Sequence, residues 1–120
     1  MRPNPVTPED PRVVEWMAYL DRHMNEDLNM DQLAERFFVS KFHMMRLFKA
    51  QTGFTIHTYL LQRRLMAARH LIERGMRTTE ACYRCGFRSY SSFTRAYAKH
   101  FGTSPTGRLV SEKSQTEGVE

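Results

Sequence analysis

Residues 40–53 have the sequence SKFHMMRLFKAQTG, and residues 89–102 have the sequence SYSSFTRAYAKHFG. Both stretches begin with serine, end with glycine, and carry an arginine six positions after the serine and an aromatic residue two positions further on. Serine is a preferred N-terminal cap of an α-helix, and glycine is the preferred residue just past its C-terminus. Each stretch therefore predicts one helix, and the constant spacing of 49 residues between them indicates an internal repeat.

A second, shorter helix is expected before each of these stretches. Each short helix carries a small residue on its predicted inner face, Ala34 in the first copy and Cys82 in the second. The turn follows four residues later, at Phe38 and at Gly86. A short helix, a tight turn and a second helix form a helix-turn-helix motif. The sequence thus predicts two such motifs, at about 30–52 and about 78–101.

The rest of the chain also has helical patterning. A long helix is expected from about 56 to 74, between the two motifs. Asp10 followed by Pro11 predicts the start of another helix, because aspartate is a good cap and proline suits the first helical position. Its buried side is expected to carry Val13, Met17, Leu20 and Met24. No stretch alternates with the period of two typical of strands, so we expect an all-α domain over 11–108, with a lead-in or linker over 1–10 and a flexible tail over 109–120.

Length and composition limit the class of protein. A chain of 120 residues, 41% of them hydrophobic and 26% charged, fits one folded domain. No apolar run approaches the roughly 20 residues that a membrane-spanning helix needs. The N-terminal residues do not have the pattern of a signal peptide, and two cysteines are too few for a disulfide scaffold. These features predict a cytoplasmic protein.

The net charge of +5 is distributed unevenly along the chain. Residues 36–108 hold fourteen basic and two acidic side chains, a net charge of +12, whereas residues 1–35 hold three basic and eight acidic ones, a net charge of −5. A concentrated positive charge of this size attracts polyanions, which include nucleic acids and anionic membrane surfaces. Because fourteen of the 18 basic residues are arginine, bidentate contacts with phosphate or guanine are favoured.

Further residues between Leu28 and about Arg108 extend the repeated stretches into a wider pattern. They are Leu33-Ala34, Ser40, Phe48, Thr52-Gly53, Tyr59, Arg64-Leu65, Ala68, Gly86-Phe87, Phe93, Arg95 and Phe101-Gly102-Thr103-Ser104-Pro105. This pattern resembles the DNA-binding region of the AraC/XylS transcription regulators of bacteria. The resemblance implies two helix-turn-helix subdomains joined by a long linker helix, a homeodomain-like pair. It also implies a transcription regulator, such as an activator, that binds a specific sequence of double-stranded DNA.

The sequence departs from the family pattern at two places. Phe38 is bulky at a turn position that is often small, and the Ile-Ala pair usual in the fifth helix is Ala81-Cys82. Both departures are expected to change packing without changing the fold.

The helix after each capping serine is expected to turn one face to the core and the opposite face to solvent. The inward residues are expected to be Met44, Leu47, Phe48, Phe93, Ala96, Tyr97 and Phe101. The resemblance implies that the outward residues contact base edges in the major groove, and these are Phe42, Met45, Arg46, Tyr90, Ser91, Thr94 and Arg95. The residues expected to bind phosphates are Lys41, Lys49, Ser92 and Lys99.

The side-chain chemistry suggests what each outward residue would contact. Arg46 and Arg95 suit guanine O6 and N7, or a phosphate. Phe42 and Met45 cannot donate hydrogen bonds and suit the methyl group of thymine. An alternative places Phe42 and Met45 in the core of a slightly rotated helix. Since the two outward faces differ, an asymmetric DNA site is expected rather than a palindrome.

The length of the connecting helix bears on the shape of the DNA. Nineteen residues of helix span about 28 Å. Successive major grooves on one face of straight DNA are about 34 Å apart. We therefore expect the duplex to bend toward the protein, or one motif to contact only the backbone.

Other kinds of chemistry have little support in the sequence. Cys82 and Cys85 have the spacing of a redox or zinc motif, but zinc takes four ligands and no second pair is present. The five histidines are dispersed, and Glu73 and Glu80 are the only carboxylates in the basic block. We therefore expect two structural cysteines, no metal, no cofactor and no catalytic residue, and hence a protein that is not an enzyme.

Two hypotheses about the partner follow. The first is double-stranded DNA at a promoter or operator. In the second, the chain is a basic helical module and its partner is RNA or an acidic protein. This second hypothesis leaves the repeated serine-capped helices unexplained. RNA polymerase and a sensory domain outside this chain are further expected partners. A membrane is not an expected partner. The expected location is the cytoplasm, at the nucleoid.

Overall fold

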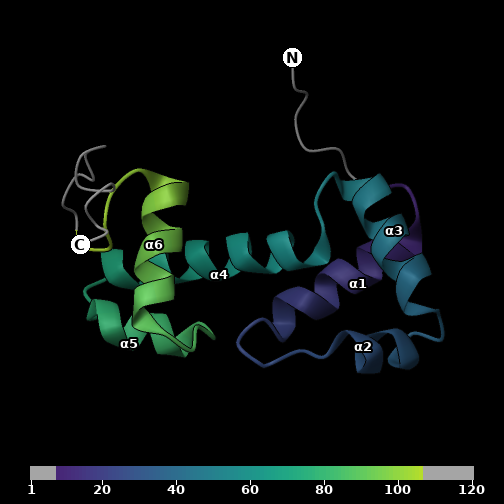
Figure 1. Cartoon of the computed structure of the whole chain (residues 1–120), viewed down its shortest axis with the longest axis horizontal. Helices are drawn as coiled ribbons and strands as arrows, with labels where there is room; N and C mark the ends of the chain where they lie inside the picture. Colours follow the sequence, from purple (N-terminus) through teal and green to yellow (C-terminus); the bar gives the residue numbers. More distant parts are fainter. Residues whose placement is uncertain (1–7, 107–120) are drawn as a thin grey trace, which may run out of the picture. The chain divides into compact units, whose positions relative to one another are not determined.

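The structure, a computed structural model, describes residues 8–106 of the chain. This part consists of six helices without a strand, which confirms the all-α class. The helices are α1 (Pro11–Arg22), α2 (Met30–Arg36), α3 (Lys41–Thr52), α4 (Ile56–Glu73), α5 (Thr78–Arg84) and α6 (Tyr90–Phe101) (Figure 1). Residues 1–7 of the expected lead-in and the whole expected tail, 109–120, lie outside the described part. Within that part, no helix is both long and apolar enough to span a bilayer.

The helices form two compact units, each of which contains one helix-turn-helix motif. Unit 1 extends to Arg63 and includes α1, α2, α3 and the first part of α4. Unit 2 begins at Arg64 and includes the rest of α4 with α5 and α6. The two motifs are thus α2–α3 and α5–α6, as the repeat predicts.

The longer helix of each motif begins and ends as the sequence predicts. Ser40 and Ser89 each accept a hydrogen bond from the backbone N–H three residues further on, at 3.1 and 3.2 Å. Gly53 and Gly102 follow the last helical residues with φ angles of +86° and +81°. Glycine adopts this left-handed conformation without steric cost, so both helices stop at the same point of the repeat.

The core of unit 1 lies between α1, α2, α3 and the start of α4. Trp16 and Leu20 of α1 and Met44 and Phe48 of α3 are fully buried. The ring of Phe48 meets the ring of Tyr59 edge to face, with centroids 5.5 Å apart. The other buried members are Val13, Leu33, Ala34, Ile56 and Leu60. This packing decides which face of α3 is left exposed.

A polar cluster fastens α1 to α4 in unit 1. The Tyr59 hydroxyl and Arg63 Nε both donate hydrogen bonds to one carboxylate oxygen of Asp21, at 2.9 and 3.1 Å. Burial and this hydrogen bond to Asp21 raise the pKa of Tyr59 to about 12. The tyrosine therefore remains a neutral donor to Asp21 throughout the physiological range.

A second polar contact holds the chain before α1. The side-chain oxygen of Gln51, near the end of α3, accepts hydrogen bonds from the backbone N–H groups of Glu9 and Asp10, at 2.9 and 3.0 Å. Asp10 in turn caps α1 by accepting a hydrogen bond from the backbone N–H of Arg12 at 2.9 Å. The start of α1 is thereby attached to the C-terminal end of α3.

Unit 2 is built around a row of aromatic rings on α6. Phe93 and Tyr97 are buried with ring centroids 5.5 Å apart, and Phe101 continues the row 4.6 Å from Tyr97. The guanidinium of Arg69, on α4, lies 4.7 Å from the centre of the Phe101 ring. The remaining buried residues are Leu65, Ala68, Ala81, Cys82, Cys85 and Pro105.

The two turns share a left-handed backbone conformation, but the first turn holds it with a residue other than glycine. Phe38 has a φ of +58° although it is not glycine, and its side chain is 92% exposed. Gly86, at the same place in unit 2, has a φ of +95°. The expectation that Phe38 alters packing is therefore wrong. The Phe38 ring lies in solvent rather than in the core. The departure from the family pattern instead gives a non-glycine residue a strained backbone angle.

We expect Phe38→Gly to stabilise the protein. The left-handed conformation costs a non-glycine residue about 1–2 kcal/mol, and a glycine at position 38 would remove this cost. Roughly 0.5–1 kcal/mol of that stabilisation is lost again, because glycine is more flexible in the unfolded chain. A rise in the free energy of unfolding of about 0.5–1 kcal/mol should follow in denaturant titrations. Phe38→Ala, which removes the ring and keeps Cβ, is the control. Equal stability of the two variants would contradict strain at this position.

Candidate nucleic-acid interface

The outer face of α3 is exposed because its opposite face forms the core of unit 1. Phe42 is 72% exposed and Met45 is 43% exposed. Arg46 and Lys49 are also exposed, on the turns that follow. The four residues occupy positions i, i+3, i+4 and i+7, so they lie along one side of the helix. Their exposure excludes the alternative in which Phe42 and Met45 belong to the core.

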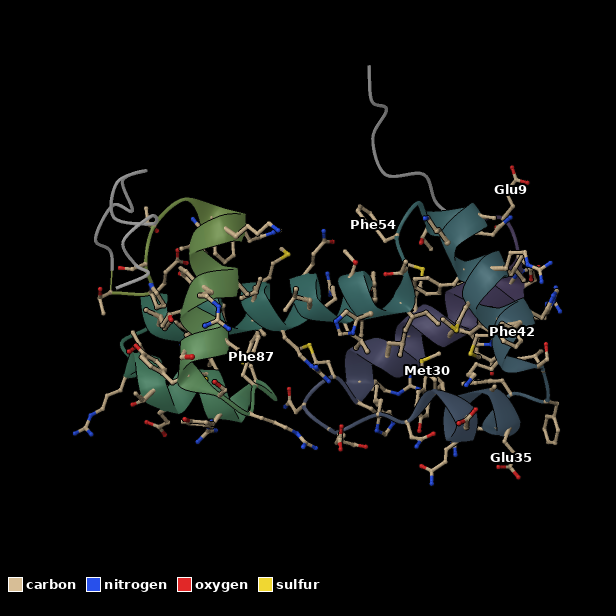
Figure 2. All side chains as sticks on the ribbon, viewed as in Figure 1. Glu9, Met30, Glu35, Phe42, Phe54 and Phe87 are labelled. Carbon is tan, nitrogen blue, oxygen red and sulfur yellow. The ribbon has the colours of Figure 1, made fainter. Side chains whose placement is uncertain are left out.

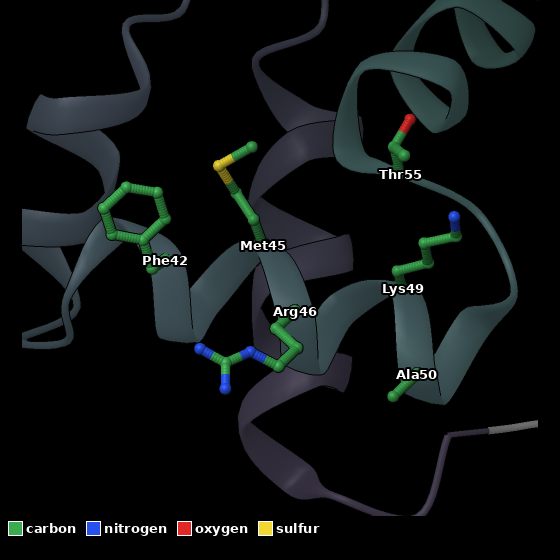
Figure 3. Close-up of a pocket in the computed structure, with 6 residues that line it drawn as sticks. All are labelled: Phe42, Met45, Arg46, Lys49, Ala50 and Thr55. Atoms are coloured by element: carbon green, nitrogen blue, oxygen red, sulfur yellow. The ribbon is translucent and has the colours of Figure 1, made fainter.

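These four side chains line a shallow groove with two further residues. The groove has a volume of about 520 Å³ and is lined by Phe42, Met45, Arg46, Lys49, Ala50 and Thr55 (Figure 3). Sequence reasoning did not include Ala50 and Thr55. Ala50 could have been found from its place four residues after Arg46. Thr55 follows the end of α3, and no helical spacing predicts it.

Arg46 is available for a contact outside the protein. No hydrogen bond or ion pair joins it to another side chain in residues 8–106. Its guanidinium extends away from the α3 ribbon in Figure 3. An arginine in this state can donate two parallel hydrogen bonds to guanine or phosphate without first losing a partner.

The outer face of α6 carries polar groups. Ser91 and Arg95 are exposed, and Arg95 Nη1 lies 3.4 Å from the Ser91 hydroxyl oxygen. Thr94 is half-buried, and its hydroxyl donates a hydrogen bond to the Ser91 carbonyl at 3.0 Å. Unlike Arg46, Arg95 thus has a weak partner on its own helix.

Tyr90 is only partly exposed, although the sequence predicts an outward-facing side chain. It is half-buried, and its hydroxyl shares a hydrogen bond of 2.8 Å with the hydroxyl of Thr78, the first residue of α5. Its ring also lies 5.9 Å from that of Phe93. This contact joins the starts of α5 and α6, and the helical pattern of α6 alone does not reveal it.

The residues expected to bind phosphates differ in their surroundings. Lys41 forms an ion pair with Asp31 at 3.1 Å, in which both side chains are solvent-accessible. Lys49 and Lys99 are exposed, and within residues 8–106 neither has an ion-pair partner. Ser92 is exposed, and its backbone N–H is used by the Ser89 cap. A surface ion pair such as that of Lys41 is worth only about 0–1 kcal/mol, so phosphate can replace Asp31.

The cysteine pair lies in the core of unit 2. Cys82 and Cys85 are both buried and both reduced. Burial raises the pKa of each thiol, which disfavours the thiolate needed for metal binding or redox chemistry. Nowhere in residues 8–106 do three His, Cys, Asp or Glu side chains come together as metal ligands. Both cysteines therefore act as small apolar residues here.

Two helix-turn-helix motifs, each with an exposed second helix bearing arginine, define a DNA-binding domain of the helix-turn-helix class. A family model for a helix-turn-helix domain matches residues 33–107. A crystal structure of a transcriptional regulator from Chromobacterium violaceum, described as an AraC-type DNA-binding domain-containing protein, has a TM-score of 0.74 and 30% identity. The match covers 80% of this chain and 87% of that one. The chain belongs to the AraC family of DNA-binding transcription regulators.

Two further matches agree with this assignment. The DNA-binding domain of AdpA, a global transcriptional factor crystallised with a target DNA, has a TM-score of 0.72 and 28% identity, with 78% of this chain and 86% of that chain covered. The HTH-type transcriptional activator RhaS of Escherichia coli (strain SE11) is 38% identical over 90 residues, which are 74% of this chain and 32% of RhaS. The chain thus spans about a third of the length of the curated relatives it matches. For the matched residues, the prediction of a DNA-binding module rather than an enzyme is confirmed.

Proposed function

We propose that this chain binds double-stranded DNA at a specific sequence and regulates transcription there. The observation that carries the proposal is the pair of exposed helix faces on α3 and α6, with Arg46 and Arg95 at equivalent positions of the repeat. The surrounding residues 36–108 carry a net charge of +12, which supplies the attraction to the phosphate backbone.

In this proposal the exposed faces of α3 and α6 enter two successive major grooves. The residues proposed to contact bases are Phe42, Met45, Arg46, Tyr90, Ser91, Thr94 and Arg95, with Tyr90 restricted to the exposed part of its ring. The residues proposed to bind phosphates are Lys41, Lys49, Ser92 and Lys99. Base contacts determine the sequence, and phosphate contacts fix the register on the duplex.

We expect one chain to bind one asymmetric site and to bend it. The 18 residues of α4 make a helix of about 27 Å. Two successive major grooves of straight DNA are about 34 Å apart, so bending toward the protein favours contact with both. Titration of a selected duplex should give a 1:1 complex, and circular permutation of the site should show a bend. Two chains on a straight palindrome would contradict this arrangement.

A competition experiment separates DNA from the other candidate partners. Duplexes that bind are first selected from a random pool, and the complex is then challenged with single-stranded DNA, RNA and unrelated duplex. The proposal requires that only the selected duplex competes efficiently. Equal competition by RNA would instead support a general basic module.

The proposal extends to partners outside this chain. The curated relatives are about three times as long as the matched region, which is consistent with an added sensory domain. Acidic residues of α1 and α2, such as Glu15 and Glu35, are exposed. We propose that these residues contact a protein partner, RNA polymerase. Glu35 extends from the outer side of α2, away from α1 (Figure 2). Contacts with DNA and with RNA polymerase would together place the protein at the nucleoid.

A further inference from the structure

The two recognition faces differ at matched positions of the repeat. Phe42 and Met45 on α3 occupy the positions that Ser91 and Thr94 occupy on α6, whereas arginine is kept on both helices. Serine and threonine donate and accept hydrogen bonds, and phenylalanine does neither. Unit 1 therefore presents apolar groups to DNA where unit 2 presents hydroxyl groups.

The apolar groups of unit 1 form a surface that could bury a small apolar group. Phe42 and Met45 line one groove with Ala50 and with the side chains of Arg46 and Lys49. The stems of arginine and lysine are aliphatic, so they add apolar surface while their charged ends stay in water. Phe42 and Met45 are exposed side by side in this groove, so they form one apolar patch rather than isolated exposed residues.

The major groove of DNA presents one kind of apolar group, the C5-methyl group of a pyrimidine. Thymine carries it, and cytosine and uracil carry hydrogen at the same carbon. Methylation of cytosine at C5 adds the same methyl group at the same place. We infer that unit 1 recognises the C5-methyl group itself, through Phe42 and Met45, and so accepts 5-methylcytosine in place of thymine. The inference rests on the proposed binding of α3 in the major groove.

Arg46 indicates which base is expected beside this methyl group in the DNA. It lines the same groove and follows Met45 directly in the chain. Arginine favours guanine, and its guanidinium is not engaged by another side chain in residues 8–106. The methylated pyrimidine is thus expected beside a guanine, and cytosine methylation at such a step would strengthen binding.

The test uses duplexes that the protein has selected from a random pool. Each thymine is replaced in turn by deoxyuridine, which removes only the methyl group. At one or two positions we expect affinity to fall about fourfold per methyl group, the value for one buried methyl. At the same positions a cytosine duplex should bind about fourfold more tightly when that cytosine is methylated at C5.

The repeat itself supplies the matched variant. In Phe42→Ser combined with Met45→Thr, α3 carries the residues of α6, and both methyl effects should disappear. Val14→Ala, which trims an exposed apolar residue of α1, should leave both effects unchanged. If a selected site is bound specifically but the methyl effects are absent, or if they persist in the double variant, the inference is overturned and the proposed function is not. Failure to select any site would overturn the proposed function as well.

Discussion

Affinity for the selected duplex is expected to fall by about 10³–10⁵ when the salt concentration rises from 50 to 200 mM, as for a protein that makes roughly 6–10 phosphate contacts. The physical reason is that each neutralised phosphate releases condensed counterions, and added salt opposes that release. The net charge of +12 over residues 36–108 is large enough for contacts of this number. Fluorescence anisotropy of a labelled duplex, measured at several salt concentrations, gives the slope.

Two lysines provide the variants for this measurement. Lys49 and Lys99 are exposed, and no acidic partner competes for them within residues 8–106. Lys49→Ala and Lys99→Ala should each reduce the salt slope by about one phosphate contact and keep the preference for the selected site. Thermal unfolding of both variants should match that of the parent chain. An affinity that does not change with salt would contradict an electrostatic role for the basic block.

Replacement of either exposed arginine is expected to weaken specific binding strongly. Arg46→Ala and Arg95→Ala should each lose about 1–3 kcal/mol, or roughly 10- to 100-fold in affinity, the range for an arginine that contacts a base. Both side chains lie outside the core, so the free energy of unfolding should stay nearly constant. Competition binding to the selected duplex measures the loss.

Arginine-to-lysine variants separate base contacts from simple charge. Arg46→Lys keeps the charge and loses the two parallel donors that match guanine. If Arg46 contacts a base, the lysine variant should bind unrelated duplex normally and discriminate poorly between sequences. The same design applies to Arg95. Normal discrimination by both alanine variants at physiological salt would show that neither arginine determines the sequence.

Helix ends and helix faces could be predicted because each depends on a few local residues. Ser40 and Ser89 cap their helices, and Gly53 and Gly102 end them, since these preferences arise within a single turn. The exposed face of α3 followed from the same helical spacing. Repetition of the serine-to-glycine stretch after 49 residues made the fold class secure.

The features that sequence missed depend on contacts across the chain or on backbone angles. Trp16 of α1 is fully buried although the apolar spacing did not select it, and Met17 is only partly buried against the same core. The Tyr90 hydroxyl hydrogen-bonds Thr78 on the neighbouring helix α5. Phe38 takes a backbone angle that favours glycine, and no pattern of apolar residues reports on such an angle.

The hydrogen bonds of Gln51 have a mechanical consequence. One side-chain oxygen on α3 holds the backbone at Glu9 and Asp10, so the strand of chain entering the domain is tethered to the end of the helix proposed to contact bases. Tension applied along the chain at Glu9 would act on that end of α3 through these two hydrogen bonds, as well as on α1 through the backbone. A force on the chain ahead of α1 would then also act on the helix that is proposed to contact DNA bases.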